Sequence, residues 1–380
     1  MQSTLDLSEL NRRIGRLFMA GIPGPEMDSD TEALIRDYAL GGVILFARNI
    51  ENPIQLASLC SRLQQVAMEY HGIPLFLAVD QEGGPVARLR HPFTRFSGNS
   101  AIGNDPAPEQ RAVEFGQTTA KEMRLVGLNM NMAPVVDVLC GTPERHLDGR
   151  LFGRDPRKVA HLGQLVIKSL QENGVMAVAK HFPGLGKATR DPHHDLPIIE
   201  ADRDELNRIH LPPFQAAVAQ GVSAVMTSHA RYPALDPEYP GTLSREIITR
   251  LLREEWGFEG LVITDDLEMG AIRREPGVPQ GVVAAFSAGC DVLLICEDQG
   301  NVLRGMELLR DLLIRKEIPI QRLHESARRV MAAKTRIMER WQKVSLETVG
   351  DYFTMQNPQE RNSRSVGMSE TENPAGTAAE

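Results

Sequence analysis

The stretch with the highest density of reactive side chains runs from Lys180 to Pro197 and reads K-H-F-P-G-L-G-K-A-T-R-D-P-H-H-D-L-P. Lys180 and His181 directly follow a short apolar run, and Asp191 and His193 lie in the Pro/Gly-rich segment beyond it. A carboxylate that is bonded to an imidazole orients the ring and raises its basicity, so an Asp-x-His pair can move protons near neutral pH. The same spacing is also typical of a solvated polar loop with a local turn.

A second candidate group follows another apolar run, residues 261–264. Asp265 is the first carboxylate after that run, in the segment I-T-D-D-L-E-M-G. A carboxylate in this position can act as a nucleophile towards the anomeric carbon of a sugar. Asp266 and Glu268 are the neighbouring alternatives, and Asp266 could equally cap the helix that follows.

Other polar side chains follow apolar runs in the same way. Asp80, in V-D-Q-E-G-G-P-V-A-R, could accept hydrogen bonds from ligand hydroxyls, and Arg88 could donate them. These two residues could instead form an ion pair that only holds a loop. Arg150, in D-G-R-L-F-G, either binds a ligand or only holds its loop in place. Asp137 could support the site, but we expect it to have a structural role in a turn.

The apolar runs predict eight β-strands, with amphipathic helices between them. We place the strands at Leu17–Gly21, Gly42–Phe46, Leu75–Val79, Leu128–Met132, Val175–Lys180, Ala224–Thr227, Leu261–Thr264 and Val292–Ile295. The helices are placed at Asp30–Leu40, Pro53–Tyr70, Pro108–Val126, Pro156–Asn173, Arg203–Gln220, Ser244–Glu255, Pro279–Ala288, Asn301–Arg315 and His324–Val344. Apolar strands that alternate with helices indicate a parallel sheet covered by helices.

The positions of the polar residues distinguish a closed barrel from an open sheet. Six of them come at or just past the ends of predicted strands: Asp80, Asp137, Lys180, His181, His229 and Asp265. A barrel gathers such positions at one mouth. We therefore predict a single-domain α/β fold, a (β/α)₈ TIM-type barrel over residues 1–349, followed by a disordered tail over 350–380.

Composition and charge narrow the classes of molecule that the protein could bind. The net charge of −8 is diffuse and no Lys/Arg tract stands out, which argues against nucleic acid. The four cysteines have no metal-binding spacing, which favours buried thiols in a reducing compartment. No run has the length of a signal peptide core or a membrane span, so we expect a cytoplasmic protein, without a membrane or nucleic-acid partner, that acts as a monomer.

Together these motifs resemble those of glycoside hydrolase family 3, most closely its short, single-domain β-N-acetylglucosaminidases of bacterial cell-wall recycling. The resemblance covers about Leu17 to Arg336 and is carried by V-D-Q-E-G-G, by K-H-F-P-G-x-G followed by D-x-H, and by T-D-D-L-x-M. It implies hydrolysis with retention of configuration, with neither a metal nor an organic cofactor, and an N-acetylglucosaminyl muropeptide as substrate.

The resemblance also implies roles for individual residues. Asp265 matches the nucleophile, His193 the general acid/base and Asp191 its dyad partner. The residues that match the sugar-binding positions are Asp80, Arg88, Arg150, Lys180, His181, Met226 and His229. Two positions depart from the family pattern: Leu185 stands where many relatives have His, and Pro192 where Ser or Thr is usual.

Several alternatives stay open at this point. A β-glucosidase, or an enzyme of the same family that transfers the sugar to phosphate, would use the same motifs. A metal-dependent barrel hydrolase could use His181, Asp191, His193 and His229 as ligands. A sugar-binding protein without catalysis is a further alternative, because a fold does not determine a function.

Overall fold

Eight parallel β-strands form the centre of the structure, a computed structural model in which residues 7–142, 144–340 and 343–356 are described. The strands are β1 (Phe18–Gly21), β2 (Gly42–Leu45), β3 (Phe76–Val79), β6 (Met130–Asn131), β7 (Met176–Phe182), β8 (Ala224–Thr227), β11 (Leu261–Ile263) and β12 (Leu293–Ile295). From β1 to β11, each of these strands pairs with the next one along the chain, and β12 pairs with β1. A parallel bridge between Ile263 and Val292 closes the ring, so the predicted (β/α)₈ barrel is confirmed.

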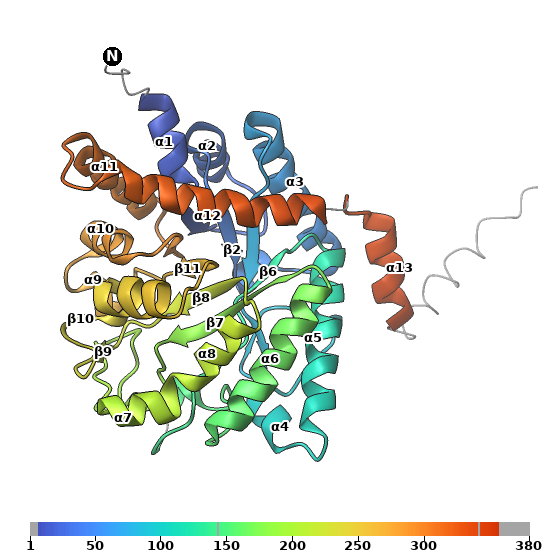
Figure 1. Cartoon of the computed structure of the whole chain (residues 1–380). Helices are drawn as coiled ribbons and strands as arrows, with labels where there is room; N and C mark the ends of the chain where they lie inside the picture. Colours follow the sequence, from blue (N-terminus) through green and yellow to red (C-terminus); the bar gives the residue numbers. More distant parts are fainter. Residues whose placement is uncertain (1–6, 143, 341–342, 357–380) are drawn as a thin grey trace, which may run out of the picture.

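Helices surround this barrel, and Figure 1 shows α5, α6 and α8 side by side on its outer face. The longer helices are α1 (Leu7–Gly15), α2 (Ser29–Tyr38), α3 (Pro53–His71), α5 (Pro108–Leu125), α6 (Pro156–Glu172), α8 (Pro212–Ala219), α10 (Val278–Ala288), α11 (Gln299–Ile314), α12 (Ile320–Glu339) and α13 (Leu346–Gln356). The short ones are α4 (Asn99–Asn104), α7 (Arg203–Glu205) and α9 (Gly270–Arg273), and π-helical turns span Leu206–His210 and Glu246–Glu255. No helix among the described residues has the length and apolarity needed to cross a membrane.

Local sequence signals account for many helix ends. In α3, the side chain of Asn52 accepts a hydrogen bond from the backbone N–H of Gln55 at 2.9 Å, and Pro53 occupies the first helical position. The helix ends at Gly72, whose φ of +63° is left-handed and favours glycine. With Gly72 as its cap, the last helical residue is His71, one residue beyond the predicted end at Tyr70.

Two short hairpins at the strand ends were not predicted: β4 (Gln81–Gly83) with β5 (Val86–Ala87), and β9 (Arg231–Tyr232) with β10 (Asp236–Pro240). Their sequences are short and rich in polar residues, Pro or Gly, so they lack the apolar alternation that marks a strand. The first hairpin matters for the site because it carries the residues that follow Asp80.

The prediction of a disordered tail from residue 350 is wrong for Gly350–Gln356, which belong to α13. Val349 and Phe353, four residues apart, are 0% and 5% exposed, and the Phe353 ring contacts Phe93 edge-on at 4.7 Å between centroids. Two apolar residues on one helical face were too weak a sequence signal, and packing on the barrel decides the outcome. The rest of the predicted tail, 357–380, lies outside the described residues.

The seam between β11 and β12 depends on one fully buried carboxylate, Asp291. Its backbone N–H donates to the Val262 carbonyl at 2.7 Å, and its Oδ2 accepts from the Val262 N–H at 3.1 Å. The same carboxylate binds the guanidinium groups of Arg253 and of Arg329, the latter at 3.2 Å. Ser326 donates to its Oδ1 at 2.6 Å, so Asp291 joins the barrel seam to α12.

We expect Asp291→Asn to lower the free energy of unfolding by about 3–5 kcal/mol, because the change leaves buried arginines without their counter-charge. Urea denaturation at pH 7 measures the loss. The control is Asp37→Asn, which removes an exposed ion pair with Arg36 and should change stability by less than about 1 kcal/mol. Equal effects of the two substitutions would contradict this role for Asp291.

Candidate active site

A cavity of about 260 Å³ opens at the carboxyl ends of the barrel strands. Eight of the ten residues that the sequence proposed line it: Asp80, Arg88, Arg150, Lys180, His181, His193, Met226 and Asp265. Parallel strands deliver their C-terminal residues to the same rim, so side chains that are far apart in the sequence meet there. Ile44, Phe46, Leu294 and Cys296 add an apolar wall on the side of β2 and β12.

The cavity wall contains a line of alternating charges. Lys180 Nζ lies 2.7 Å from Asp80 Oδ1 and 2.7 Å from Glu82 Oε1. Glu82 in turn binds Arg150 through two bonds, of 2.8 Å to Nε and 2.9 Å to a terminal nitrogen. At the other end, Arg88 lies 3.9 Å from Asp80. We call these five residues the charge chain.

Because Glu82 and Lys180 are buried, the ionisation of each depends on the opposite charges beside it. The side chains of Glu82 and Lys180 are only 1% and 3% exposed. Burial by itself would raise the pKa of Glu82, but the positive charges of Lys180 and Arg150 outweigh it and lower that pKa to about 2. Burial would lower the pKa of Lys180, and the charges of Asp80 and Glu82 reverse the effect and raise it. Glu82 and Lys180 therefore stay ionised around neutral pH.

His181 is held beside this chain by Asp137. Its Nδ1 lies 2.8 Å from Asp137 Oδ2, and the same carboxylate accepts the backbone N–H groups of His181, at 3.2 Å, and of Leu185, at 2.7 Å. The peptide bond between Lys180 and His181 is cis, and both side chains line the cavity. Asp137 thus orients an imidazole whose other nitrogen is left for the cavity.

The Asp191–His193 pair reaches the cavity on the loop after β7. His193 Nδ1 lies 2.6 Å from Asp191 Oδ1, which also accepts the backbone N–H of His193 at 2.9 Å. His193 lines the cavity, whereas Asp191 lies behind it as the residue that orients the ring. Burial would raise the pKa of Asp191, but the hydrogen bonds from His193 outweigh it and the pKa is lowered.

The loop is placed by its contact with the segment after β11. The backbone N–H of Gly270 donates to the His193 carbonyl at 3.0 Å, and that of Ala271 to the Pro192 carbonyl at 3.2 Å. A side chain at Gly270 would come within 2.7 Å of the His193 carbonyl oxygen, so only glycine permits this approach. The contact brings His193 and Asp265 to the same cavity.

Asp265 and Asp266 have opposite electrostatic surroundings. Burial would raise the pKa of Asp265, but the nearby imidazoles of His181 and His229 outweigh it and lower that pKa. For Asp266 burial dominates, and with Glu268 and Asp265 close by it raises the pKa to about 7. Asp265 is therefore the carboxylate that stays ionised at neutral pH, as a nucleophile requires.

His229 does not line the cavity, although the sequence placed it there. It is 1% exposed, and its two ring nitrogens contact Thr242 Oγ1 at 2.7 Å and the Asp266 carbonyl at 2.8 Å. It supports the wall behind Asp265. Both of its nitrogens are thus engaged, and no three of the four ligands of the metal-hydrolase alternative form a group among the described residues whose ligand atoms all lie within 4.8 Å of one another.

Sequence reasoning missed three residues at the site. Glu82 was only part of a motif, Asp137 was expected in a structural turn, and His146 was not considered. His146 lines the cavity, and its ring faces that of His193 at 6.5 Å between centroids. Their positions after strand ends gave some signal for Glu82 and Asp137, but no local pattern marks His146.

The two departures from the family pattern also lie at the cavity. Leu185 and Pro192 both line it, and Leu185 is 2% exposed. Leu185 therefore contributes an apolar surface to the cavity. The groups that hold the loop there are backbone atoms, such as the Leu185 N–H on Asp137, and they do not depend on the side chain.

Comparison with known proteins shows the family to which the chain belongs. Residues 9–333 match the model of the glycosyl hydrolase family 3 N-terminal domain. The chain belongs to glycosyl hydrolase family 3. Within that family it is 35% identical over 305 residues to a β-hexosaminidase of Pseudomonas aeruginosa strain LESB58, covering 80% of this chain and 90% of that protein.

Other members of the family are longer than this chain. β-Hexosaminidase A of Pseudoalteromonas piscicida is 35% identical over 345 residues, which cover 85% of this chain but 57% of that protein. The solved structure of a family 3 β-N-acetylglucosaminidase from Paenibacillus sp. strain FPU-7 is 38% identical, with a TM-score of 0.85 over 90% of this chain and 64% of that one. The chain thus spans less than two thirds of these two relatives.

The lowered pKa of Glu82 predicts how the stability of this family 3 domain depends on pH. A depressed carboxyl pKa stabilises the fold above the unfolded-state pKa of 4.5, and the contribution is lost as the pH falls towards 2. From pH 6 to pH 3, wild type should therefore lose about 2 kcal/mol more stability than Glu82→Gln.

Denaturant unfolding at the two pH values measures this difference, with Glu114→Gln as the control because Glu114 pairs with Arg111 on the surface. At pH 7, Glu82→Gln should already be destabilised by about 3–5 kcal/mol, since Lys180 and Arg150 lose a buried counter-charge. If the pH dependence is the same in wild type and Glu82→Gln, the charge chain does not hold Glu82 ionised.

Proposed function

We propose that the cavity removes terminal, non-reducing β-linked N-acetylglucosamine by a retaining, two-step hydrolysis. The observation that carries this proposal is that Asp265 and His193, from loops after different strands, line one cavity together with the charge chain. The named relatives support the choice of sugar, because they are β-hexosaminidases and a β-N-acetylglucosaminidase.

In the first step, the ionised carboxylate of Asp265 attacks the anomeric carbon, and the bond from that carbon to the leaving oxygen breaks. His193, as imidazolium, donates its proton to the leaving oxygen. A covalent glycosyl-enzyme results. The unperturbed imidazole pKa of about 6.5 suits a residue that must donate and later accept a proton near neutral pH.

In the second step, the neutral ring of His193 accepts a proton from a water molecule that attacks the same carbon. The bond to Asp265 breaks, the sugar leaves with its configuration retained, and both residues return to their starting states. Asp191 keeps the ring oriented through Nδ1, so that Nε2 performs both transfers. The lowered pKa of Asp191 keeps its carboxylate negative beside the ring.

The charge chain and His181 would hold the sugar ring. Asp80 can accept hydrogen bonds from two hydroxyls, while Arg88 and Arg150 donate, and charged groups make the strongest hydrogen bonds of this kind. Met226 adds an apolar contact at the cavity floor, where it is 3% exposed. Because Lys180 and Glu82 are paired before any ligand binds, these donors and acceptors are preorganised.

The finer identity of the substrate is also a proposal. We infer that it is an N-acetylglucosaminyl muropeptide met in the cytoplasm, in line with the resemblance that the sequence shows. Competition by such a muropeptide against a nitrophenyl glycoside tests it, and free N-acetylglucosamine is the control. A muropeptide that competes no better than the free sugar would leave only the sugar assigned.

We expect Asp265→Asn to lower kcat for nitrophenyl N-acetyl-β-glucosaminide by at least about 10³-fold, because no covalent intermediate can form. Asp266→Asn is the matched control, since Asp266 also lines the cavity, and it should retain most of the activity. Parallel assays with the β-glucoside, and with added phosphate, test the sugar and the acceptor. Faster turnover of the glucoside, or dependence on phosphate, would contradict the proposal.

The acid/base role of His193 has its own signature. His193→Ala should lower kcat by about 10²–10⁴-fold for an alkyl aglycone. The loss should be much smaller for a dinitrophenyl glycoside, whose leaving group needs no proton in the first step. Azide should then speed turnover by accepting the sugar from the glycosyl-enzyme. An equal loss on both aglycones, without rescue by azide, would show that His193 is not the acid/base.

Gly270→Ala tests whether the loop contact places His193. The added methyl group must push the His193 carbonyl away, and a displacement of about 1 Å can cost about 10²-fold in rate. We expect kcat to fall about 10- to 100-fold while binding of the sugar changes little. Gly24→Ala, where the new side chain meets nothing within 4 Å, is the control. Full activity of Gly270→Ala would show that the loop is placed by other contacts.

A further inference from the structure

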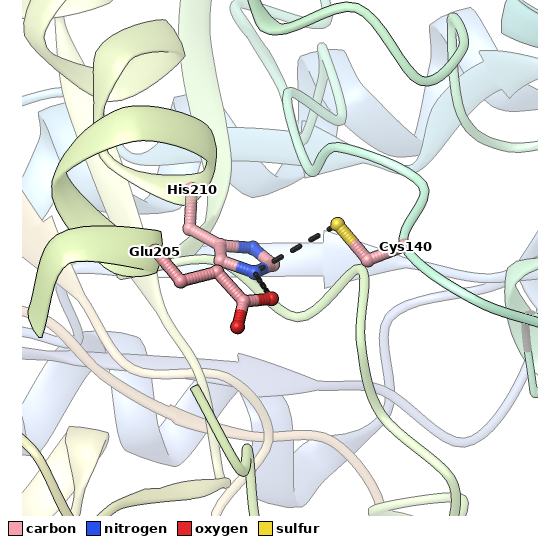
Figure 2. Close-up of side chains that lie close together, drawn as sticks. All are labelled: Cys140, Glu205 and His210. Carbon is pink, nitrogen blue, oxygen red and sulfur yellow. Dashed lines mark hydrogen bonds and ion pairs between the residues drawn. The ribbon is translucent and has the colours of Figure 1, made fainter. Parts of the chain in front are cut away.

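A second cluster of reactive side chains lies outside the cavity, behind the loop that carries His193. It comprises Cys140, Glu205 and His210, and Figure 2 shows the three side chains converging, with the imidazole between the thiol and the carboxylate. Each offers one ligand atom, and these atoms all lie within 4.8 Å of one another. The mechanism proposed above uses none of the three.

The distances in the cluster are those of a small metal site that is slightly expanded. His210 Nε2 lies 3.8 Å from Cys140 Sγ and 3.9 Å from Glu205 Oε1. Zinc bonds of about 2.0–2.3 Å in a tetrahedron place neighbouring ligand atoms about 3.3–3.6 Å apart. The two His210 contacts exceed this spacing by a few tenths of an ångström, and the third separation, between Cys140 and Glu205, is at most 4.8 Å, so small side-chain shifts would be needed to reach that geometry.

The only hydrogen bond of the His210 ring in the described part of the chain is the long one between Nε2 and the Cys140 thiol, at 3.8 Å. His210 is 0% exposed, and its Nδ1 makes no hydrogen bond within the described residues. The contact of Nε2 with Glu205, at 3.9 Å, is too long for a hydrogen bond. His210 also ends a π-helical turn, Leu206–His210, and such turns are rare and frequent at functional sites. Among the residues that the structure describes, the ring atom that faces the cluster, Nε2, is therefore held only by the long contact with the Cys140 thiol, which a metal ion could replace.

The types of the three ligand groups indicate which metal ion would bind. A thiolate, an imidazole and a carboxylate together suit Zn²⁺, whereas Mg²⁺ and Ca²⁺ prefer oxygen ligands alone. Burial lowers the pKa of His210, which keeps the imidazole neutral and able to bind a metal. Burial raises the pKa of Cys140, so an ion would have to displace the thiol proton, and binding should strengthen as the pH rises.

The carboxylate of Glu205 already forms an ion pair with a lysine side chain. Lys187 Nζ lies 2.7 and 2.8 Å from the two oxygens of Glu205, and its side chain is 32% exposed, so it can swing into solvent. Lys187 lies in the loop after β7, four residues before Asp191. The Gly186 carbonyl of that loop also accepts the backbone N–H of Cys140 at 3.0 Å. An ion in the cluster would therefore compete directly with the loop for Glu205.

We propose that Cys140, His210 and Glu205 form a site for Zn²⁺ or a similar transition-metal ion, and that Lys187 is its built-in competitor. A fourth, open position would be filled by water, as in zinc sites with three protein ligands. Binding of the ion exchanges the Lys187–Glu205 ion pair for a metal–carboxylate bond. Metal binding thereby removes the ion pair that ties the loop carrying Asp191 and His193 to Glu205.

Cobalt(II) is the probe for the test, because a cobalt–thiolate bond gives a charge-transfer absorption band that oxygen and nitrogen ligands do not. Wild type should bind one Co²⁺ with this band, and Zn²⁺ should displace it. Cys140→Ser should lose the band, and His210→Gln should weaken binding by at least about tenfold. Cys60→Ser, which removes a buried thiol elsewhere, is the matched control and should leave the band unchanged.

Lys187→Gln separates the proposal from simple damage to the fold. Removal of the competing cation should tighten Co²⁺ binding by about tenfold, a gain that misfolding cannot produce. Circular dichroism without metal checks that each variant is folded. A second set of potential ligands, Glu144, His146 and Asp191, lies beside His193, so His146→Gln is tested as well. The proposal is overturned if Co²⁺ binds without the thiolate band, if the band survives Cys140→Ser, or if Lys187→Gln does not tighten binding.

Discussion

The buried ammonium group of Lys180 is the interaction on which the cavity depends. A buried lysine is costly unless it is paired, and here Asp80 and Glu82 lie 2.7 Å from it on two sides. Glu82 then requires Arg150, so β7, the β4–β5 hairpin and the loop before α6 are held in one arrangement. The cavity wall is held together because removal of any one of these charged side chains would leave another buried without its counter-charge.

The opposite side of the cavity is built differently. There the loop after β7 is held by backbone hydrogen bonds with Gly270, Ala271 and Cys140, by the carboxylate of Asp137 and by the ion pair between Lys187 and Glu205. A wall of paired charges is rigid, whereas a loop held by a few hydrogen bonds can shift by small amounts. This division suits a reaction in which the sugar is held still while one imidazole serves first as acid and then as base.

Much of the fold could be predicted because barrel strands are marked locally. Each is a short apolar run, and the C-terminal end of a parallel strand must lie at the mouth, which also brought Asp265, Lys180 and His181 to the right rim. The prediction was wrong for α13, whose apolar face of Val349 and Phe353 is narrow, and for His229, which supports the wall instead of lining it. In both cases packing against distant residues decided the outcome.

By itself, the sequence determined the order of strands and helices, the family to which the motifs belong and the residue types available for acid/base and nucleophilic chemistry. These depend on spacing along the chain, which a single sequence contains. Only the tertiary structure decided which charges pair, since Lys180 and Asp80 are 100 residues apart, and that Glu82 and Asp137 orient the site. It alone brought Cys140 to His210 across 70 residues, because closure of the barrel sets distances that no local pattern records.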